Sequence, residues 1–262
     1  MAKVALKDWK EQIRDPKIEC MSRDEMTALQ SERLVKQVKN VYDHVEFYRK
    51  KMDDMGIEPG DIKGIEDIGK LPFTTKEDLR ANYPFGLLAV PQEKIVRVQG
   101  TSGTTGKLTL ASYTQKDIDV WGECVARGLT MAGLTAEDRL HICYGYGLFT
   151  GGAGLNGGSH KVGCLTLPMS SGNTERQIQF MMDLQSTILC CTPSYAAYIG
   201  ETLKEKGSTA DILWTNLCTN SPLMCFWKNK NCRFAGASRS FLRYYGLSSV
   251  DELIGKTDED MH

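Results

Sequence analysis

The sequence predicts an α/β fold in which helices cover a layered, mostly parallel β-sheet. Short apolar strands alternate with amphipathic helices from Lys94 to Gly207, an order typical of parallel sheets. Several of these helices begin at capping-box spacings, which marks where they start. After Gly207 the pattern changes to short apolar pieces. We therefore expect two domains, residues 1–207 and residues 208–262.

The first part of the chain is expected to be helical. Ser22 and Glu25 have the spacing of a capping box, so a long helix should begin there. A loop is expected over Gly56–Gly69, and Thr74 and Glu77 have the same spacing for a second, short helix. The apolar residues that form one face of the long helix are Leu34, Val38, Val41, Val45 and Tyr48.

The sheet is expected from five runs with the composition of strands. Helices should start after the second, fourth and fifth of these runs, at Thr114, Thr174 and Ser194. Seven glycines lie between Gly145 and Gly158, which indicates a loop whose backbone approaches another group closely. The expected strands are Lys94–Gln99, Leu108–Tyr113, Leu140–Tyr144, Val162–Leu167 and Thr187–Thr192.

The residues after Gly207 have the pattern of a small domain that is only begun. Lys228–Asn231 indicates a tight polar turn, Arg233–Ala237 a strand and Ser238–Tyr245 a short helix. Thr257–Asp260 has a helix-start pattern with almost no chain after it. We therefore expect this second domain to be incomplete.

Composition excludes several classes of protein. The 262 residues include 32 Lys and Arg against 33 Asp and Glu, a net charge of −1, which excludes a strongly basic nucleic-acid-binding protein. The nine cysteines follow no zinc or disulfide pattern, so we expect reduced thiols, no metal site and a cytoplasmic location. The sequence has no signal-peptide pattern and no apolar run long enough to cross a membrane.

One loop has the composition of a phosphate-binding site. Its glycines allow backbone N–H groups to turn toward one anion, its hydroxyls can donate to phosphoryl oxygens, and its lysine adds a positive charge. This set suits a nucleoside triphosphate, and an exposed hairpin connection is the structural alternative. The loop consists of Thr101, Ser102, Gly103, Thr104, Thr105, Gly106 and Lys107.

The spacing of this loop excludes a P-loop of the Walker A type. With Gly106 and Lys107 at its end, that motif requires glycine at position 101, where this chain has threonine. It also requires a hydroxyl residue at the position of Leu108. The loop is expected to join two strands, whereas a P-loop precedes a helix.

Thr101–Lys107 resembles the phosphate-binding signature of the adenylate-forming enzymes, and five further segments resemble their phenylacetate–CoA ligase branch. The resemblance extends to about Gly207. One local difference is Leu108, where the branch usually has a proline whose only effect would be to stiffen the loop. The resemblance implies the N-terminal domain of that fold, incomplete here. The five segments are Leu71–Arg80 (LPFTTKEDLR), Tyr83–Val90 (YPFGLLAV), Tyr144–Gly152 (YGYGLFTGG), Pro168–Thr174 (PMSSGNT) and Thr192–Tyr195 (TPSY).

The resemblance implies ATP-dependent activation of an arylacetic acid. Enzymes of this branch use ATP and Mg²⁺ to form an acyl-adenylate, and the CoA thiolate then displaces AMP to give the thioester. The resemblance implies that the β- and γ-phosphates are held by Ser102, Thr104, Thr105 and Lys107. The aryl pocket would be lined by Tyr144, Phe149 and Gly151, for which a plain core role is the alternative.

Other residues near this pocket receive weaker assignments. His160 and Pro193–Tyr195 are expected close to it, whereas Cys190 and Cys191 are expected only to pack. The sequence assigns no catalytic residue.

Residues 211–262 resemble the first half of a PAS sensor domain, an α+β fold, in Phe226–Lys228, Phe241–Gly246 and Ile254–Asp260. The lid and adenine contacts of the ligase family are not found after Gly207, so we expect impaired turnover. Two unrelated reading frames joined near Gly207–Asp211 would explain this organisation. The alternative to such a joining error is a purposeful fusion. For function, the alternatives to the ligase are a PAS-type sensory or ligand-binding module and a non-functional fusion product. The expected partners are arylacetate, ATP and CoA, and apolar surface left by an incomplete fold favours a homo-oligomer.

Overall fold

The computed structural model describes residues 12–101, 108–205, 226–229 and 231–261. The chain divides into two compact units. The helix–hairpin unit comprises residues 15–120 and 147–150, and the sheet unit comprises residues 1–14, 121–146 and 151–262. Helix α5 (Gln115–Met131) begins in the first and ends in the second. The expected domain boundary near residue 207 lies outside the described residues and stays a prediction.

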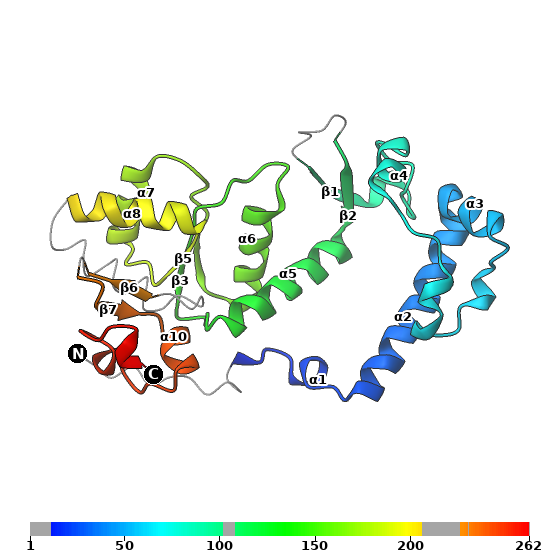
Figure 1. The fold of residues 1–262 in the computed structure, drawn as a ribbon. Coiled ribbons are helices and arrows are strands. Elements are labelled where there is room, and N and C mark those ends of the chain that lie inside the picture. Colours follow the sequence, from blue (N-terminus) through cyan, green and yellow to red (C-terminus); the bar gives the residue numbers. More distant parts are fainter. Residues whose placement is uncertain (1–11, 102–107, 206–225, 230, 262) are drawn as a thin grey trace. The chain divides into compact units, whose positions relative to one another are not determined.

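The helix–hairpin unit is built from short helices and one β-hairpin (Figure 1). The predicted capping box is present, because the hydroxyl of Ser22 accepts from the N–H of Glu25 (3.2 Å) and the Glu25 carboxylate accepts from the N–H of Ser22 (2.9 Å). Its elements are α1 (Pro16–Glu19), α2 (Arg23–His44), α3 (Glu46–Asp54), the 3₁₀ helices η2 (Pro59–Asp61), η3 (Ile65–Lys70) and η4 (Gln92–Lys94), α4 (Lys76–Ala81), β1 (Ile95–Gly100) and β2 (Leu110–Thr114).

The apolar face predicted for one long helix is divided between α2 and α3. Helix α2 ends at His44, and Val45 has extended backbone angles (φ −120°, ψ 103°) before α3 begins. The Val45 side chain is 1% exposed, so the break buries it in the core of the unit. The prediction of a continuous helix was wrong because apolar spacing does not detect a break that leaves the apolar residues on the buried side.

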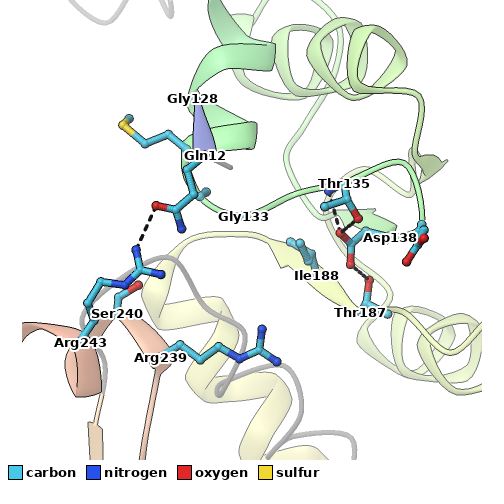
Figure 2. A pocket seen from close by; sticks show the side chains of 13 residues that line it. Gln12, Gly128, Gly133, Thr135, Asp138, Thr187, Ile188, Arg239, Ser240 and Arg243 are labelled. Carbon is cyan, nitrogen blue, oxygen red and sulfur yellow. Dashed lines mark hydrogen bonds between the residues drawn. The ribbon is translucent and has the colours of Figure 1, made fainter. Parts of the chain in front are cut away.

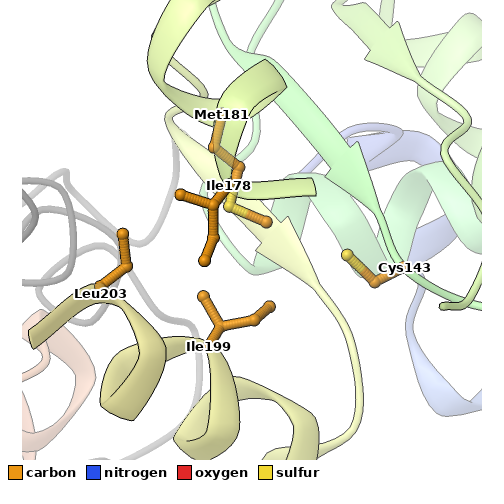
Figure 3. Close-up of a cluster of buried hydrophobic side chains, with 5 residues drawn as sticks. All are labelled: Cys143, Ile178, Met181, Ile199 and Leu203. Carbon is orange, nitrogen blue, oxygen red and sulfur yellow. The ribbon is translucent and has the colours of Figure 1, made fainter. Parts of the chain in front are cut away.

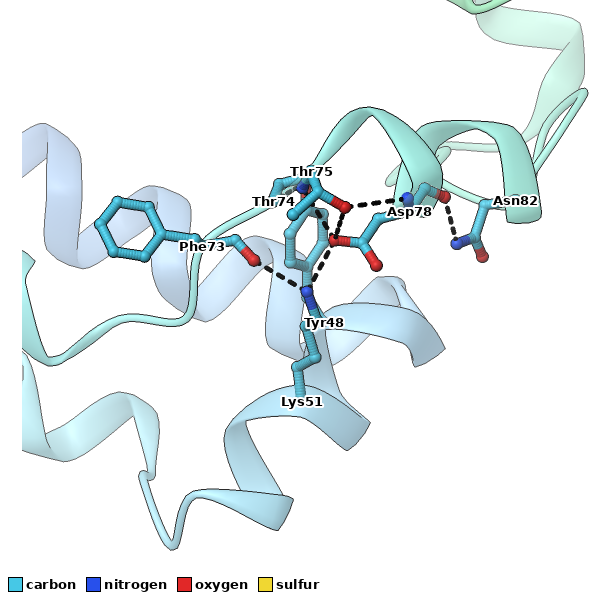
Figure 4. A network of polar contacts seen from close by, with 7 residues as sticks. All are labelled: Tyr48, Lys51, Phe73, Thr74, Thr75, Asp78 and Asn82. Carbon is cyan, nitrogen blue, oxygen red and sulfur yellow. Dashed lines mark hydrogen bonds and ion pairs between the residues drawn. The ribbon is translucent and has the colours of Figure 1, made fainter. Parts of the chain in front are cut away.

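A polar network joins α3 to α4 (Figure 4). Nζ of Lys51 donates to the carbonyl oxygen of Phe73 (2.8 Å) and to Oδ2 of Asp78 (2.7 Å). Oδ2 of Asp78 also accepts from the N–H (2.8 Å) and hydroxyl (3.0 Å) of Thr75, which completes a capping box. The cap predicted at Thr74 is thus wrong by one residue. Thr75 and Asp78 have the same three-residue spacing as Thr74 and Glu77, and the carboxylate of Asp78 also pairs with Lys51.

Replacing Asp78 with asparagine is expected to make the stability of the fold depend less steeply on pH between about pH 5 and about pH 2. The hydrogen bond from Lys51, followed by that from the Thr75 amide, lowers the pKa of Asp78 from 3.8 to about 2. Because the folded pKa is below the unfolded one, the carboxylate stabilises the fold above pH 3.8 and loses this effect as the pH falls toward 2. Urea midpoints measured from about pH 5 to about pH 2 should therefore fall more steeply in the wild type. Lys51→Met should reduce the pH dependence of the urea midpoint in the same way. An equal pH dependence in all three proteins would contradict this role of Asp78.

The sheet unit contains a parallel sheet with helices on both faces (Figure 1). Strand β3 lies between β4 and β5 and is parallel to both. Helices α5 and α6 pack on one face, and α7 and α8 on the other. The predicted layered α/β arrangement is confirmed here, although β1 with β2 and β6 with β7 are antiparallel pairs. The elements are β3 (Arg139–Ile142), α6 (Thr150–Val162), β4 (Leu165–Leu167), α7 (Thr174–Asp183), β5 (Ile188–Cys190) and α8 (Pro193–Glu205).

Each face of the parallel sheet has its own apolar cluster, because successive side chains of a strand point to opposite faces. Toward α7 and α8, the buried cluster consists of Cys143, Ile178, Met181, Ile199 and Leu203 (Figure 3). Toward α5 and α6, it consists of Leu129, Leu134, Leu140, Ile142 and Cys164.

The glycine-rich segment between residues 145 and 158 is largely helical, so the predicted loop is wrong from Thr150 onward. Its glycines allow α6 to pack closely on α5. A Cβ on Gly154 would lie 2.9 Å from the Trp121 ring, and a Cβ on Gly158 would lie 2.5 Å from Cγ1 of Val125. Close helix packing has overridden the low helix propensity of glycine.

Residues 226–261 fold around a small cluster of their own. Strands β6 (Phe226–Lys228) and β7 (Phe234–Ala237) pair antiparallel, and Ser238 caps α10 (Arg239–Tyr244) by accepting from the N–H of Phe241 (3.3 Å). The predicted strand and short helix are confirmed, whereas the PAS-like identity stays a prediction. The buried residues are Phe234, Ala237, Phe241, Leu242 and Leu253.

No helix in the part of the chain that the structure describes combines the length and the apolar character needed to cross a membrane.

Candidate functional site

Three of the segments singled out in the sequence follow the three parallel strands. Tyr144 lies just beyond β3, Pro168 directly follows β4, and Thr192 lies just beyond β5. The carboxyl ends of parallel strands share one edge of the sheet, and ligands of open α/β sheets bind in the crevice outside that edge. Residues 144–146, 168–174 and 191–195, here called the carboxyl-edge segments, therefore form the candidate site.

Side-chain contacts connect the carboxyl-edge segments. Oγ of Ser171 lies 3.7 Å from the position of a Cβ on Gly145, so the second segment lies against the first. The hydroxyl of Thr174 is 3.1 Å from that of Tyr195, which joins the second to the third. Burial raises the pKa of Tyr144 and of Tyr195, so both phenols stay protonated and neutral at neutral pH.

The structure brings Tyr144 and Gly151 together. A Cβ on Gly151 would lie 3.7 Å from the Tyr144 side chain. A Cβ on Gly152 would lie 2.8 Å from the carbonyl oxygen of Gly145 and 3.0 Å from that of Tyr144, so only glycine lets the first turn of α6 pack beneath this segment. Tyr144 also packs, partly buried, on the apolar cluster of α5 and α6. It therefore belongs to the core and to the edge of the candidate site.

Phe149 belongs to the helix–hairpin unit, and its side chain is 56% exposed. Its loop is bound to β1, because the N–H of Gly100 donates to the carbonyl of Leu148 (2.9 Å). The buried Gln99 adds to this attachment. When the side-chain amide of Gln99 is oriented so that its nitrogen faces acceptors, this nitrogen donates to the carbonyl oxygen of Phe149 (3.1 Å). Phe149 is thus anchored to the strand that leads into the phosphate loop.

The predicted phosphate loop joins two antiparallel strands, as expected, and does not precede a helix. Gly100 pairs with Leu110 at the end of the hairpin, and the N–H of Thr101 donates to the carbonyl of Thr109 (3.1 Å). The Thr101 hydroxyl accepts from the N–H of Thr109 (3.3 Å), so it closes the base of the loop. The other predicted ligands, Ser102, Gly103, Thr104, Thr105, Gly106 and Lys107, lie outside the described residues.

A buried polar network behind the site was missed by sequence reasoning. His141 of β3 is 0% exposed, and its Nε2 is 2.6 Å from Oε1 of Gln177 on α7. Burial lowers the pKa of His141, with a smaller opposing effect from Gln177, so the ring is neutral at neutral pH. One signal was present in the sequence. A histidine inside a strand covered on both faces requires a polar partner.

Two weaker assignments have different outcomes. Burial raises the pKa of Cys190 to about 12 and that of Cys191 to about 11, so both are protonated packing residues, as predicted. His160 is exposed in the last turn of α6, whereas the first turn of α6 contacts Tyr144. The length of the helix separates His160 from the site, so that prediction was wrong.

A cleft of about 610 Å³ lies at the opposite edge of the sheet (Figure 2). Two of its lining residues, Asp138 and Thr187, directly precede β3 and β5. The Asp138 carboxylate accepts from the N–H (2.7 Å) and hydroxyl (2.8 Å) of Thr135 and from the hydroxyl of Thr187 (2.8 Å). Because ligands of open α/β sheets bind beyond the carboxyl ends of the strands, this cleft is not the candidate site.

The chain is similar to known proteins in sequence and in fold. No protein-family model matches the chain. It is 50% identical over 190 residues to a phenylacetate-coenzyme A ligase of Aromatoleum evansii, covering 72% of this chain and 43% of that protein. It is 47% identical over 192 residues to the phenylacetate-coenzyme A ligase of Escherichia coli K12, covering 73% and 44%.

The structure resembles that of a 2-hydroxyisobutyryl-CoA ligase solved in complex with 2-HIB-AMP and CoA. The TM-score is 0.70 at 26% identity, over 79% of this chain and 45% of that one. The chain thus spans less than half the length of these relatives. Over roughly three quarters of its own length, it resembles phenylacetate-coenzyme A ligases in sequence and a CoA ligase in fold.

Proposed function

We propose that the chain acts in the ATP-dependent activation of an arylacetic acid to its acyl-adenylate and then to its CoA thioester. The observation that carries this proposal is the position of the carboxyl-edge segments. Three separate stretches that resemble the ligase branch lie along the edge where α/β sheets bind ligands. Phenylacetate-coenzyme A ligases are among the proteins most similar in sequence, so we propose phenylacetate or a similar aryl acid as the substrate.

The chemistry requires that the charge of the triphosphate be neutralised. A carboxylate oxygen of the acid attacks the α-phosphorus of ATP, the bond to the β-phosphate oxygen breaks, and pyrophosphate leaves. Positive charge and hydrogen-bond donors on the β- and γ-phosphates stabilise this leaving group. In the proposal, Lys107 and the hydroxyls of Ser102, Thr104 and Thr105 supply these groups, and the hydrogen bonds between Thr101 and Thr109 hold the base of the loop.

Mg²⁺ would be held mainly by the nucleotide. The described residues contain no group of three or more His, Cys, Asp or Glu side chains arranged to hold a metal ion. Magnesium in nucleotide sites is commonly bound through substrate phosphates and water with one or two carboxylates. In the proposal, magnesium binds together with ATP, where it would offset phosphate charge.

On the acid side, the proposal uses aromatic and hydroxyl side chains of the carboxyl-edge segments and the adjoining start of α6. The Tyr144 ring lies against Gly151, and the hydroxyls of Thr174 and Tyr195 are paired at the same edge. Aromatic rings bind a planar ligand through their faces, and the neutral phenols add no charge. In the proposal, Tyr144, Phe149 and Gly151 line the aryl pocket.

Lys107→Ala is expected to weaken ATP binding by about tenfold or more, because a hydrogen bond between charged groups is lost. Isothermal titration and the rise in melting temperature with ATP and Mg²⁺ measure the change. Lys94→Ala is the matched control, since Lys94 is an exposed cation just before β1 of the same hairpin. Thioester formation from phenylacetate, ATP and CoA is measured separately. Wild-type affinity in Lys107→Ala, or no ATP binding by the wild type, would refute the proposal.

A further inference from the structure

We infer that Gln177 is a positioning residue that holds the Pro168–Asn173 turn at the proposed acid site. The inference rests on the proposed function, which places the acid at the carboxyl-edge segments. Gln177 itself is not proposed as a substrate contact. It is 1% exposed and lies on the buried side of α7.

The amide of Gln177 connects two parts of the molecule. Its nitrogen donates to the carbonyl oxygens of Ser170 (2.8 Å) and Gly172 (3.1 Å), both within the turn. Its oxygen faces Nε2 of His141 (2.6 Å) and accepts a weaker contact from Sγ of Cys143 (3.5 Å). The turn is therefore fixed to β3, the central strand of the sheet, through one side chain.

The turn requires such an attachment because its backbone is unusual. Ser170 (φ 67°), Gly172 (φ 88°) and Asn173 (φ 47°) all lie in the left-handed region. Residues other than glycine seldom adopt this region, and they stay there only when surrounding contacts hold them. The two inward-facing carbonyls accept hydrogen bonds from a single donor group, so losing that group would release both together.

The held turn has a second side, which faces the candidate site. Ser171 lies between the two anchored carbonyls, and its hydroxyl lies beside Gly145. Gly145 directly follows Tyr144, a predicted residue of the aryl pocket. If the turn moved, Ser171 would move relative to this pocket. Gln177 thereby acts on acid binding through the turn.

Two substitutions separate the two halves of the amide. Gln177→Glu keeps an oxygen for His141 and removes the donor to the turn, whereas Gln177→Met keeps the volume and removes both. Gln179→Met is the matched control, since Gln179 is exposed on the same helix and bonds only locally to Asp183 (3.0 Å). The readouts on the full chain are melting temperature, hydrogen exchange of residues 168–173, and affinities for ATP and for a non-hydrolysable phenylacetyl-adenylate analogue.

Both Gln177 variants should speed exchange in the turn and weaken binding of the acyl-adenylate analogue by about tenfold, while ATP affinity stays within about twofold. Gln179→Met should change neither. Wild-type affinity for the analogue in Gln177→Glu, unchanged exchange in the turn, or equal losses for ATP and the analogue would overturn the inference. If the wild type binds neither ligand, the proposed function fails, and the exchange data still decide whether Gln177 holds the turn.

Discussion

Gly158→Ala is expected to destabilise the protein by about 2 kcal/mol, whereas Gly157→Ala, one residue earlier on α6, should be neutral or stabilising by up to about 1 kcal/mol. The two positions differ in what a methyl group would meet. At Gly158 the new Cβ would lie 2.5 Å from Cγ1 and 2.8 Å from Cβ of Val125, and 3.0 Å from the backbone nitrogen of Ala126. At Gly157 the nearest atom is Cα of Gly122, at 3.9 Å.

A rotamer change of Val125 cannot relieve the clash at Gly158, because its Cβ and the Ala126 nitrogen move only with the backbone. Helices α5 and α6 would therefore have to separate, which costs packing on one face of the sheet. Alanine also favours the helix by about 1 kcal/mol over glycine, and this gain is included in both estimates. Urea unfolding of the three proteins measures the difference. Equal midpoints for the two alanine variants would show that α5 and α6 do not pack as described.

The same helix shows where sequence reasoning is weakest. Helix starts that depend on neighbours three residues apart were predictable, as Ser22 with Glu25 and Thr114 with Asp117 show. Helix α6 was not, because glycine is a poor helix former in isolation and its value here lies in a contact with α5. Helix propensity is a property of the local sequence, whereas the glycines of α6 are explained by its tertiary packing against α5.

Ambiguous local signals were resolved by distant residues. Thr74 and Thr75 each precede an acidic residue by three positions, and only the ion pair of Lys51 with Asp78 decides which threonine is the cap. The helix face through Val45 had the correct residues, but its break depends on burial of that side chain. In both cases the elements were predictable and their boundaries were not.

The candidate site was predictable at the level of strands. Segments that follow buried parallel strands must share an edge, so Tyr144, Pro168 and Thr192 could be grouped from the sequence. The contact of His141 with Gln177 could not, because it joins residues 36 positions apart and neither residue has a local signal for its partner. The phosphate loop was assigned by resemblance, and its role rests on the Lys107→Ala experiment.

Met181→Ala is expected to destabilise the protein by about 3 kcal/mol, whereas the adjacent Met182→Ala should change stability by less than about 0.5 kcal/mol. Met181 is 0% exposed and packs with Ile178 and Ile199 between α7 and α8 (Figure 3), whereas Met182 is 43% exposed. Removing the buried side chain leaves a cavity that close-packed neighbours fill only in part. Urea midpoints at neutral pH measure both changes, and equal midpoints would contradict the buried position of Met181.

The Met181 variant also distinguishes two explanations of how α7 would influence the proposed acid site. Met181 lies one helical turn beyond Gln177 on the same buried side of α7, so both residues connect this helix to the sheet. If general packing of α7 shapes the proposed acid site, Met181→Ala should weaken binding of the acyl-adenylate analogue as much as Gln177→Met does, at temperatures where both proteins are folded. If the hydrogen bonds of Gln177 to the turn are responsible, Met181→Ala should lower stability and leave the affinity of the folded protein within about twofold of the wild type, because the carbonyls of Ser170 and Gly172 keep their donor.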